Sequence, residues 1–530
     1  MMSFASLTFL LYLLGMMLVY FLAPARIRWA VLLAASYLYL GITSPHTAIY
    51  LLLTTVAVFF AAQKIERIQA AFASHPDRNR WEAQEKRERK QACQREKRLW
   101  LTLALTAVFG LLIVLKYANF AIDNANVLLG RPEGTGRVDW LLPLGISFYT
   151  LQAGGYLIDI YRGKYAVDQH FFKFALFTSW FPQLVQGPIS RYDALAAQLY
   201  EGHAFDWRRM KSGALRMLWG YFKKLVIADR LALVVEPLFT DFAGQGYAGA
   251  YIWAAAVLYT FQIYADFSGG MDIVLGMSEI FGIRMTENFR RPILAGSVAE
   301  FWQRWHITLG SWMRDYLFYP LALSGRFNRL GKRLRRRFGP YVGKVAPAVL
   351  ASFIVFTCVG VWHGAEWKYV VYGFYQALFV STATLLEPFY ARMRKGLHVR
   401  ETSAGFQAFR VLRTFFIIMV GRVLSRAGSL GDALAMLGAG VSAWNPQVLW
   451  DGSFLAFGVT AAEWVVLAVA VAAWMAVDAL NERGVVVRER LEARALPLRW
   501  AAYILGAMIV LIFGVYGPGF DAASFIYGGF

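Results

Sequence analysis

Glu300-Phe-Trp-Gln-Arg-Trp-His-Ile-Thr-Leu-Gly-Ser-Trp-Met-Arg-Asp-Tyr-Leu317 is a polar stretch with long apolar sequence on both sides. Together with Glu287-Asn-Phe-Arg-Arg-Pro-Ile-Leu294 it carries two glutamates, four arginines, one aspartate, one histidine and three tryptophans. Ionisable groups at membrane depth are costly unless they are paired or face water, so they mark function by default. A second polar island, Gly360-Val-Trp-His-Gly-Ala-Glu-Trp367, follows. We expect the histidines of these islands, His306 and His363, to form the core of a functional site.

The composition indicates a membrane protein. The chain has 530 residues, of which 58% are hydrophobic and 17% are charged, whereas soluble proteins carry about 25% charged residues. The apolar residues form runs of about 17–24 residues, the length that crosses a hydrocarbon core of ~30 Å. The sequence therefore predicts an all-α, polytopic transmembrane protein with one membrane domain over residues 1–530.

The net charge of +20 follows the pattern of a membrane topology. Basic residues concentrate between the apolar runs, as they do in cytoplasmic loops. A nucleic-acid-binding protein would carry its basic face on a soluble module, which this sequence lacks, so we expect no nucleic-acid partner. If every basic segment is cytoplasmic, the N-terminus, the C-terminus and residues 119–138 and 425–453 lie outside. Residues 326–344, with eight Lys/Arg and no acid, give the strongest cytoplasmic signal.

Apolar runs predict spans at residues 3–22, 29–43, 46–62, 99–118, 140–158, 171–190, 212–230, 249–264, 270–283, 346–362, 367–390, 411–424, 454–477 and 499–517. The spans from 171 to 283 are interrupted by polar and helix-breaking residues, such as Pro182-Gln183 and Gln186-Gly187-Pro188. At membrane depth such interruptions are tolerated only where the backbone is buried in protein or lines a wet cavity. We therefore expect the middle of the chain to enclose something polar.

Residues 63–98 form the one long hydrophilic segment, with 11 Lys/Arg against 6 Asp/Glu. Glu82–Lys86 and Glu85–Arg89 have the spacing of helical ion pairs. We interpret the segment as a solvated cytoplasmic helix in preference to a lipid- or partner-binding site.

His363 lies between Trp362 and Gly364. The glycine lets a backbone or a substrate come close, and the tryptophan supplies a flat apolar wall. A histidine in such a dry pocket stays neutral and is able to accept a proton from an attacking hydroxyl, a contribution of roughly 10²–10⁴ in rate. The alternative is a buried structural histidine that bonds a backbone carbonyl, and the composition favours neither.

His306 follows two tryptophans. On a helix, Trp302 and Trp305 would flank one face with His306 beside them, and Glu300 and Arg304 would form an i,i+4 pair. Arg314 and Asp315 would neutralise other charges nearby. The alternative is a structural ion-pair network at a membrane interface, which does not explain why a histidine and three tryptophans gather there.

Other chemistries have weaker signals. The sequence has candidate oxygen and nitrogen ligands for a metal but no HExxH, CxxC or His-x-His spacing, so we expect no metal. No G-x-S-x-G stretch is present for a serine nucleophile. Cys93 lies in a basic segment and Cys358 in an apolar run, and we expect no disulfide between them.

At these residues the chain resembles the membrane-bound O-acyltransferase superfamily. The resemblance is to the bacterial branch that includes the alginate O-acetyltransferase membrane subunit and the D-alanyl transferase of teichoic acid synthesis, and it covers roughly residues 140–380. The matching stretches are Leu142-Pro-Leu-Gly-Ile-Ser-Phe-Tyr-Thr-Leu-Gln152, Tyr156-Leu-Ile-Asp-Ile-Tyr-Arg162, Phe181-Pro-Gln-Leu-Val-Gln-Gly-Pro188, Phe222-Lys-Lys-Leu-Val-Ile-Ala-Asp229, Gln262-Ile-Tyr-Ala-Asp-Phe-Ser-Gly269, Glu287-Asn-Phe, Arg304-Trp-His-Ile-Thr-Leu, Arg314-Asp-Tyr-Leu and Trp362-His-Gly.

The resemblance implies a helical bundle or barrel around a funnel and tunnel that cross the membrane. It implies that His363 is the catalytic histidine and that His306 is the second histidine of the site. The residues expected to support the site or line the tunnel are Asn288, Trp302, Arg304, Trp305, Arg314, Asp315, Tyr316, Trp362, Gln262, Asp266 and Ser268. It also divides the chain into N-terminal spans (1–62), a basic loop (63–98), a catalytic core (140–380) and C-terminal spans (381–530).

The chain departs from the pattern of this branch at three places. It has Ser268-Gly-Gly-Met-Asp272 where alginate-type relatives read Ser-Gly-Tyr-Ser-Asp, Pro320-Leu-Ala-Leu-Ser-Gly325 where Pro-Leu-Gly-Gly is usual, and Phe525-Ile-Tyr-Gly-Gly-Phe530 in place of a more aromatic ending. These differences leave the chemistry intact and do not point to alginate as the acceptor.

The resemblance therefore predicts an O-acyltransferase of the bacterial plasma membrane. It would pass an acyl group, most simply acetyl, from a cytoplasmic thioester donor to hydroxyls of an extracytoplasmic polysaccharide or wall polymer. The donor is acetyl-CoA or an acyl carrier protein, no cofactor is permanently bound, and an extracytoplasmic or membrane-anchored acyl-handling protein is the expected partner. The alternatives are D-alanyl transfer to teichoic acid or to a partner protein, and a transporter of a glycan or acyl intermediate.

Overall fold

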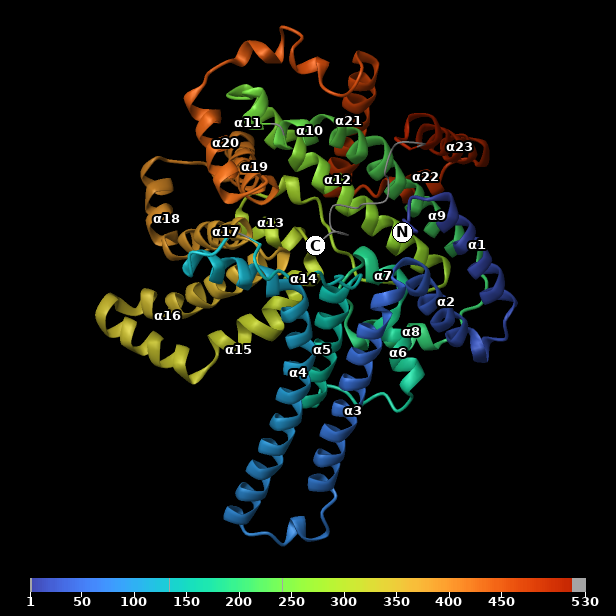
Figure 1. The fold of residues 1–530 in the computed structure, drawn as a ribbon, viewed down its shortest axis with the longest axis vertical. Coiled ribbons are helices and arrows are strands. Elements are labelled where there is room, and N and C mark those ends of the chain that lie inside the picture. The colour runs from blue at the N-terminus through green and yellow to red at the C-terminus, as the bar shows by residue number, and fades with distance from the viewer. Residues whose placement is uncertain (1, 133, 241, 517–530) are drawn as a thin grey trace. The chain divides into compact units, whose positions relative to one another are not determined.

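The computed structural model describes residues 2–132, 134–240 and 242–516. Throughout this part of the chain the regular elements are helices, and the one β-bridge joins Phe289 to Trp305 (Figure 1). The all-α class expected from the sequence is confirmed. The chain divides into two compact units, and the single membrane domain over 1–530 stays a prediction.

Unit 1 comprises the described residues of Met1–Ala214 and Val274–Thr286. Its helices are α1 (Leu7–Leu22), α2 (Arg28–Thr43), α3 (Ala48–Ala73), α4 (Ala83–Leu128), α5 (Ile146–Arg162), α6 (Phe171–Ser179), α7 (Phe181–Gln186) and α8 (Tyr192–Tyr200), with 3₁₀ turns η1 (Ala25–Ile27), η2 (Pro45–Thr47) and η3 (Pro76–Asn79). The two longest helices, α3 and α4, run side by side (Figure 1).

Unit 2 comprises the described residues of Leu215–Ile273 and Glu287–Phe530. Its helices are α10 (Asp229–Thr240), α11 (Phe242–Gln245), α13 (Val298–Arg304), α14 (Ile307–Met313), α15 (Tyr319–Ala322), α16 (Gly325–His363), α17 (Trp367–Leu385), α18 (Glu387–Gly396), α19 (Ala404–Arg426), α20 (Leu430–Ser442), α21 (Ala461–Glu482), α22 (Val487–Glu492) and α23 (Leu496–Phe513), with 3₁₀ turns η5 (Pro292–Leu294), η7 (Pro446–Leu449) and η8 (Phe454–Ala456). Two π-helical turns, η4 (Phe222–Ala228) and η6 (Arg314–Phe318), complete it. The helices α9 (Trp207–Tyr221) and α12 (Ala250–Ile280) have residues in both units.

Six described helical segments are long and apolar enough to cross a membrane. They are Ala25–Thr43, Pro45–Ala73, Ala83–Leu128, Gly325–His363, Ala461–Glu482 and Leu496–Phe513. A seventh is formed if α17 and α18, which meet at a bend of 63°, count as one span. The polytopic membrane class is thus confirmed, while the orientation of both termini stays a prediction.

Several expected boundaries are wrong. The spans 249–264 and 270–283 are one helix, α12, because Ser268, Gly269 and Gly270 continue it without a break. The expected link 119–138 is helical as far as Leu128. The expected span 140–158 becomes helical only at Ile146, after Gly145 in the left-handed region.

The hydrophilic segment 63–98 is the continuation of two helices and not one separate helix. Helix α3 extends to Ala73 and α4 begins at Ala83. Of the two expected ion pairs, Glu85–Arg89 forms at 2.9 Å, whereas Glu82 is the N-cap residue of α4 and its expected side-chain pair with Lys86 does not form. The C-terminal sequence 525–530 and the end of the last expected span at 517 lie outside the described residues.

Close backbone approaches between helices position the site in unit 2. A Cβ atom on Gly220 of α9 would lie 2.5 Å from the carbonyl oxygen of Gly269 on α12. A Cβ on Gly360 of α16 would lie 2.3 Å from the carbonyl oxygen of Tyr369 on α17. Small residues permit such contacts between membrane helices. They hold η4 beside the middle of α12, and they fix the end of α16 that carries His363.

Candidate active site

His306 lies in a tight turn between two short helices. Helix α13 ends at Arg304, Trp305 is extended, and His306 has φ 47° and ψ 53° as the N-cap residue of α14. The expected continuous helix through Trp302, Trp305 and His306 is therefore wrong. The physical reason is a competing backbone pairing, in which Arg290 N donates to Arg304 O at 2.9 Å and Ile307 N donates to Asn288 O at 3.0 Å.

Asn288 holds this turn. Its side chain is fully buried, and its Oδ1 accepts from Thr308 N at 3.0 Å and from Thr308 Oγ1 at 2.9 Å. The same oxygen lies 3.3 Å from Nδ1 of His306. An acceptor at this place selects the tautomer with its hydrogen on Nδ1, which leaves the lone pair on Nε2. The sequence match Glu287-Asn-Phe therefore marks a residue that orients the histidine.

Aromatic rings and burial keep His306 neutral. Its side chain is 1% exposed, the edge of Phe267 packs against it with ring centroids 5.0 Å apart, and it lies outside the candidate spans. Burial lowers the pKa of His306 to about 3, because an apolar surrounding disfavours the imidazolium. The imidazole is therefore uncharged at neutral pH.

His363 is the last residue of α16. It is 5% exposed, and its ring centroid is 6.1 Å from that of Tyr372 on α17. The following Gly364 has no room for a side chain, because a Cβ atom would lie 2.2 Å from the ring of Tyr369. The glycine in Trp-His-Gly is therefore required for close packing at the end of the helix.

The ring of Trp362 contacts both histidines. Its centroid is 5.8 Å from that of His306 and 5.0 Å from that of His363. The two polar islands recognised in the sequence therefore meet at one tryptophan ring inside unit 2. This placement brings together three of the expected site residues from two separate parts of the chain.

A buried charge network joins α12 to η4 and α10. Lys224 Nζ contacts Asp266 at 2.7 Å and Asp229 at 2.8 Å, and all three side chains are almost fully buried. Lys223 Nζ contacts Asp272 at 2.6 Å and donates to Ser268 Oγ at 2.9 Å. Such pairs are stable only when their geometry and remaining hydrogen bonds are good.

The sequence reasoning selected Asp266 and Ser268 but missed their partners Lys223 and Lys224. The signal was two adjacent lysines inside an apolar run, in the stretch 222–229. This stretch is the π-helical η4, and the stretch 314–318 is the π-helical η6. Both π-helical turns lie in stretches that resemble the acyltransferase superfamily. Single π turns occur frequently at functional sites.

The remaining charges of the first island form ion pairs at its edge. Arg304 contacts Glu300 at 2.7 Å, as expected, and also Glu482 at 2.9 Å. Arg291 pairs with the same glutamate. The structural ion-pair interpretation therefore applies to these residues, whereas it does not apply to the buried histidine.

Arg314 and Asp315 are exposed and pair with each other, whereas the two histidines are buried. They contact each other at 3.4 Å with side chains 56% and 39% exposed, and their expected neutralisation of other charges nearby stays a prediction. Tyr316 is buried beside Trp312. Trp302 Nε1 donates to Gln376 Oε1 at 3.2 Å, and Trp305 stacks under the guanidinium of Arg422, whose Cζ is 4.3 Å from the ring centroid.

Gln262 on α12 is buried, and its Oε1 has no hydrogen-bond donor within the described residues. In unit 1, several buried side chains of α5, α7 and the two residues before α7 also have a polar atom without a hydrogen-bond partner within the described residues. They are Ser147, Tyr149, Thr150, Ser179, Trp180, Gln183 and Gln186. Buried polar groups normally have partners. These groups support the expectation that the middle of the chain encloses something polar.

Metal ligands do not gather in this part of the molecule. Among the described residues no group of three or more His, Cys, Asp or Glu side chains is arranged to hold an ion. Cys93 and Cys358 are both free thiols.

A helical membrane protein with two buried histidines at one tryptophan ring is the class that this fold and site define. The chain belongs to the membrane-bound O-acyltransferase (MBOAT) family, whose sequence profile matches residues 138–335 and 336–425. It is 31% identical to a probable alginate O-acetylase of Azotobacter vinelandii over 445 residues, which cover 83% of this chain and 78% of that protein.

Other relatives differ in their acceptors. A probable alginate O-acetylase of Pseudomonas syringae is 34% identical over 64% of this chain, and the chain spans 60% of that protein. A peptidoglycan O-acetyltransferase of Helicobacter pylori is 30% identical over 64% of each chain. A teichoic acid D-alanyltransferase of Bacillus subtilis is 25% identical over 46% of this chain and 59% of that protein. The shared feature of these names is acyl transfer to an envelope polymer.

Proposed function

We propose that the protein transfers an acyl group, most simply acetyl, from a thioester donor to hydroxyl groups of an extracytoplasmic polysaccharide or wall polymer. The observation that carries this proposal is the meeting of His306 and His363 at the ring of Trp362. Burial keeps the imidazole of His306 neutral, so this ring places no positive charge beside His363. The family membership and the acceptors named for the relatives agree with this reaction.

In the proposed reaction the acceptor hydroxyl attacks the thioester carbonyl. A ring nitrogen of His363 takes the hydroxyl proton while the new C–O bond forms, and the proton then passes to the departing thiolate as the C–S bond breaks. His306, held by Asn288, is a positioning residue for this step. The contact with Asn288 selects the tautomer that has its hydrogen on Nδ1 and its lone pair on Nε2. The His306 ring therefore keeps one orientation beside the reacting groups.

The eight basic residues of 326–344 support a phosphate-bearing donor. Arg326, Arg329, Lys332, Arg333, Arg335, Arg336, Arg337 and Lys344 are all exposed, and none forms an ion pair with a carboxylate of the described chain. Guanidinium groups bind phosphate through charged hydrogen bonds. This surface therefore suits the phosphopantetheine of acetyl-CoA or of an acylated carrier protein, and we place it on the cytoplasmic side of the bacterial plasma membrane.

A second candidate function is D-alanyl transfer to teichoic acid, favoured by the teichoic acid D-alanyltransferases among the relatives. Both reactions need the same histidines and differ in the acyl group. In either case an extracytoplasmic or membrane-anchored acyl-handling protein is the partner that we expect to complete delivery to the polymer.

The proposal is tested by mass spectrometry of surface glycans and wall polymers. The strains are a deletion strain, the same strain with the intact gene, and the same strain with His363→Ala. We expect ester-linked acyl groups with the intact gene alone, and their mass identifies acetyl or D-alanyl. A matched control is His398→Ala, which changes an exposed histidine on the same unit. Unchanged ester content in the His363→Ala strain, with the variant present in the membrane, would overturn the proposed function.

A further inference from the structure

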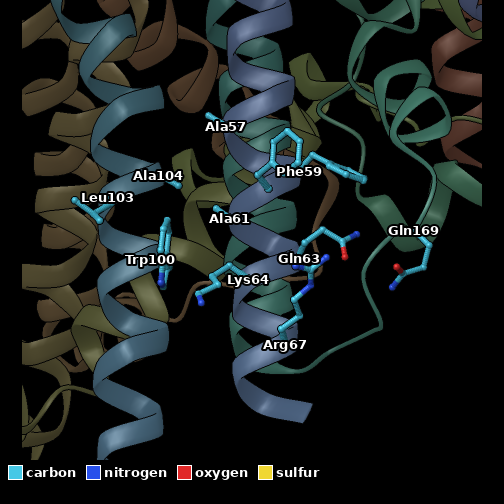
Figure 2. A pocket seen from close by; sticks show the side chains of 11 residues that line it. Ala57, Phe59, Ala61, Gln63, Lys64, Arg67, Trp100, Leu103, Ala104 and Gln169 are labelled. Carbon is cyan, nitrogen blue, oxygen red and sulfur yellow. The ribbon is translucent and has the colours of Figure 1, made fainter. Parts of the chain in front are cut away.

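A cavity of about 610 Å³ opens beside α3 and α4, in unit 1. It lies where each helix passes from its apolar part into the basic sequence 63–98. The lining side chains are those of Ala57, Phe59, Phe60, Ala61, Gln63, Lys64, Arg67, Trp100, Leu103, Ala104 and Gln169. In Figure 2, Trp100 of α4 and Lys64 of α3 extend into the space between the two helices.

The lining changes character along α3. The end toward Ala57 is apolar, and Phe60 and Leu103 are 63% and 53% exposed there. One turn further along, Lys64 and Arg67 bring two positive charges. This order, apolar and then cationic along a membrane-crossing helix, matches the order of acyl chain and phosphate in a phospholipid.

The two cations of this cavity are available to an anion. Neither Lys64 nor Arg67 forms an ion pair with a carboxylate of the described residues, and Lys64 Nζ lies 5.9 Å from the ring centroid of Trp100. The neighbouring carboxylate, Glu66, instead accepts from Val167 N at 3.2 Å and from Gln169 Nε2 at 3.2 Å. The Glu66 carboxylate is therefore hydrogen-bonded to the loop after α5 and is not paired with Lys64 or Arg67.

Basic residues elsewhere in the segment 63–98 behave differently. Arg80 is 3.8 Å from Asp77, and Arg89 is 2.9 Å from Glu85. These exposed pairs fit a solvated helical segment, which was the preferred interpretation of residues 63–98. Lys64 and Arg67 do not fit that description, because they line an apolar cavity and lack an acidic partner.

We propose that this cavity binds one anionic glycerophospholipid of the leaflet that faces residues 63–98. The acyl chains would lie against Phe60, Ala61 and Leu103, and the phosphate would contact Lys64 and Arg67. Trp100 would lie at headgroup level, where amphipathic aromatic rings are enriched in membrane proteins. Charge complementarity selects the occupant, because a zwitterionic headgroup would leave two cations facing its own positive group.

The test is native mass spectrometry of the purified full-length protein with phosphatidylglycerol or phosphatidylcholine of identical chains. The variant Lys64→Gln/Arg67→Gln is compared with Lys86→Gln/Lys90→Gln, which removes the same charge from the same helix pair at exposed positions away from the cavity. Each Lys or Arg at a membrane surface contributes a factor of about five in anionic-lipid binding. We therefore expect phosphatidylglycerol retention to fall about thirtyfold in the first variant only.

A second variant guards against simple misfolding. Ala57→Phe fills the apolar end without changing the charge, and it should also reduce phosphatidylglycerol retention. Equal retention of the two lipids by the unchanged protein, or equal losses in both charge variants, would overturn the proposal. Glycerol phosphate that competes as well as intact phosphatidylglycerol would show a site for free phosphate and would overturn it too.

Discussion

The two histidines of the site are positioned in different ways. His306 is fixed by its local backbone, since it occupies the left-handed region and its turn is bonded to Asn288 at three atoms. His363 is fixed by the packing of two long helices, because it follows the close contact of Gly360 with α17 and precedes Gly364. Hydrogen bonds position His306, and close helix packing positions His363.

This difference supports the different roles that we propose for the two histidines. A histidine whose Nδ1 is already directed at an amide oxygen has one tautomer and one orientation, which suits a positioning residue. His363, at the end of a packed helix, is the residue that we propose as the proton acceptor. The following predictions separate the hydrogen-bonded support of His306 from the packed support of His363.

The largest effect is expected from the buried charge network around Lys224. Lys224→Met leaves Asp229 and Asp266 buried without their shared cation, and breaking such a buried network costs about 3–5 kcal/mol. Thermal unfolding in detergent measures this loss. Lys395→Met, at an exposed position of α18, is the matched control and should change little. Similar melting temperatures for both variants would contradict a supporting role of the network.

The next effect concerns the His306 turn. Asn288→Ala leaves the buried N and Oγ1 of Thr308 without this acceptor, which is expected to cost about 2–6 kcal/mol because each of the two orphaned donors costs about 1–3 kcal/mol. Asn328→Ala removes one exposed hydrogen bond to Leu323 O and serves as control. Denaturation curves give the free energy of unfolding of both variants. A loss of stability in Asn288→Ala no greater than that in Asn328→Ala would contradict the role of Asn288 in holding this turn.

A smaller effect is expected at the helix contact that positions His363. Gly360→Ala places a methyl group 2.3 Å from the Tyr369 carbonyl oxygen, and overpacking of this kind costs about 1–3 kcal/mol. Transfer activity should fall further than stability, because His363 moves with the end of α16. Gly438→Ala in α20 has nothing within 4 Å and should be neutral or stabilising. A Gly360→Ala protein with normal activity would show that this contact does not position His363.

The last prediction is a pH dependence of stability from His306. Burial lowers its pKa to about 3, below the value of ~6.5 in an unfolded chain. The unfolded chain therefore binds the proton first, and this contribution to stability is complete above pH ~6.5 and is lost as the pH falls toward 3. Melting temperature against pH should be flatter for His306→Gln than for the intact protein. The exposed His398→Gln is the control, and parallel profiles for all three proteins would mean that His306 is accessible to protons.

The sequence contained enough to predict the membrane class and to select residues of the candidate site. The apolar runs indicated spans because their length matches the bilayer, and the two polar islands indicated a site because buried charge is costly. Asn288, Trp362 and both histidines were selected, and the structure places these four residues within one buried region of unit 2.

What the sequence did not predict depended on contacts distant along the chain. The helix through His306 is broken by pairing with residues 288–290, which no local propensity records. The partners of Asp266 and Ser268 are more than 40 residues away, on η4. Likewise, the sequence predicted separate spans 249–264 and 270–283, whereas Lys223 and Lys224 pair with Ser268 and Asp266 inside the unbroken helix α12.

The most direct test of the account is the rate of acyl transfer by the purified protein in lipid, with a thioester donor and the acceptor polymer identified by mass spectrometry. His363→Gln is compared with the intact protein at equal folded fraction. The account predicts a rate lower by roughly 10²–10⁴ with unchanged binding of the donor, because general-base catalysis contributes that much. A rate within about threefold of the intact protein would contradict the assignment of His363 as the group that accepts the hydroxyl proton.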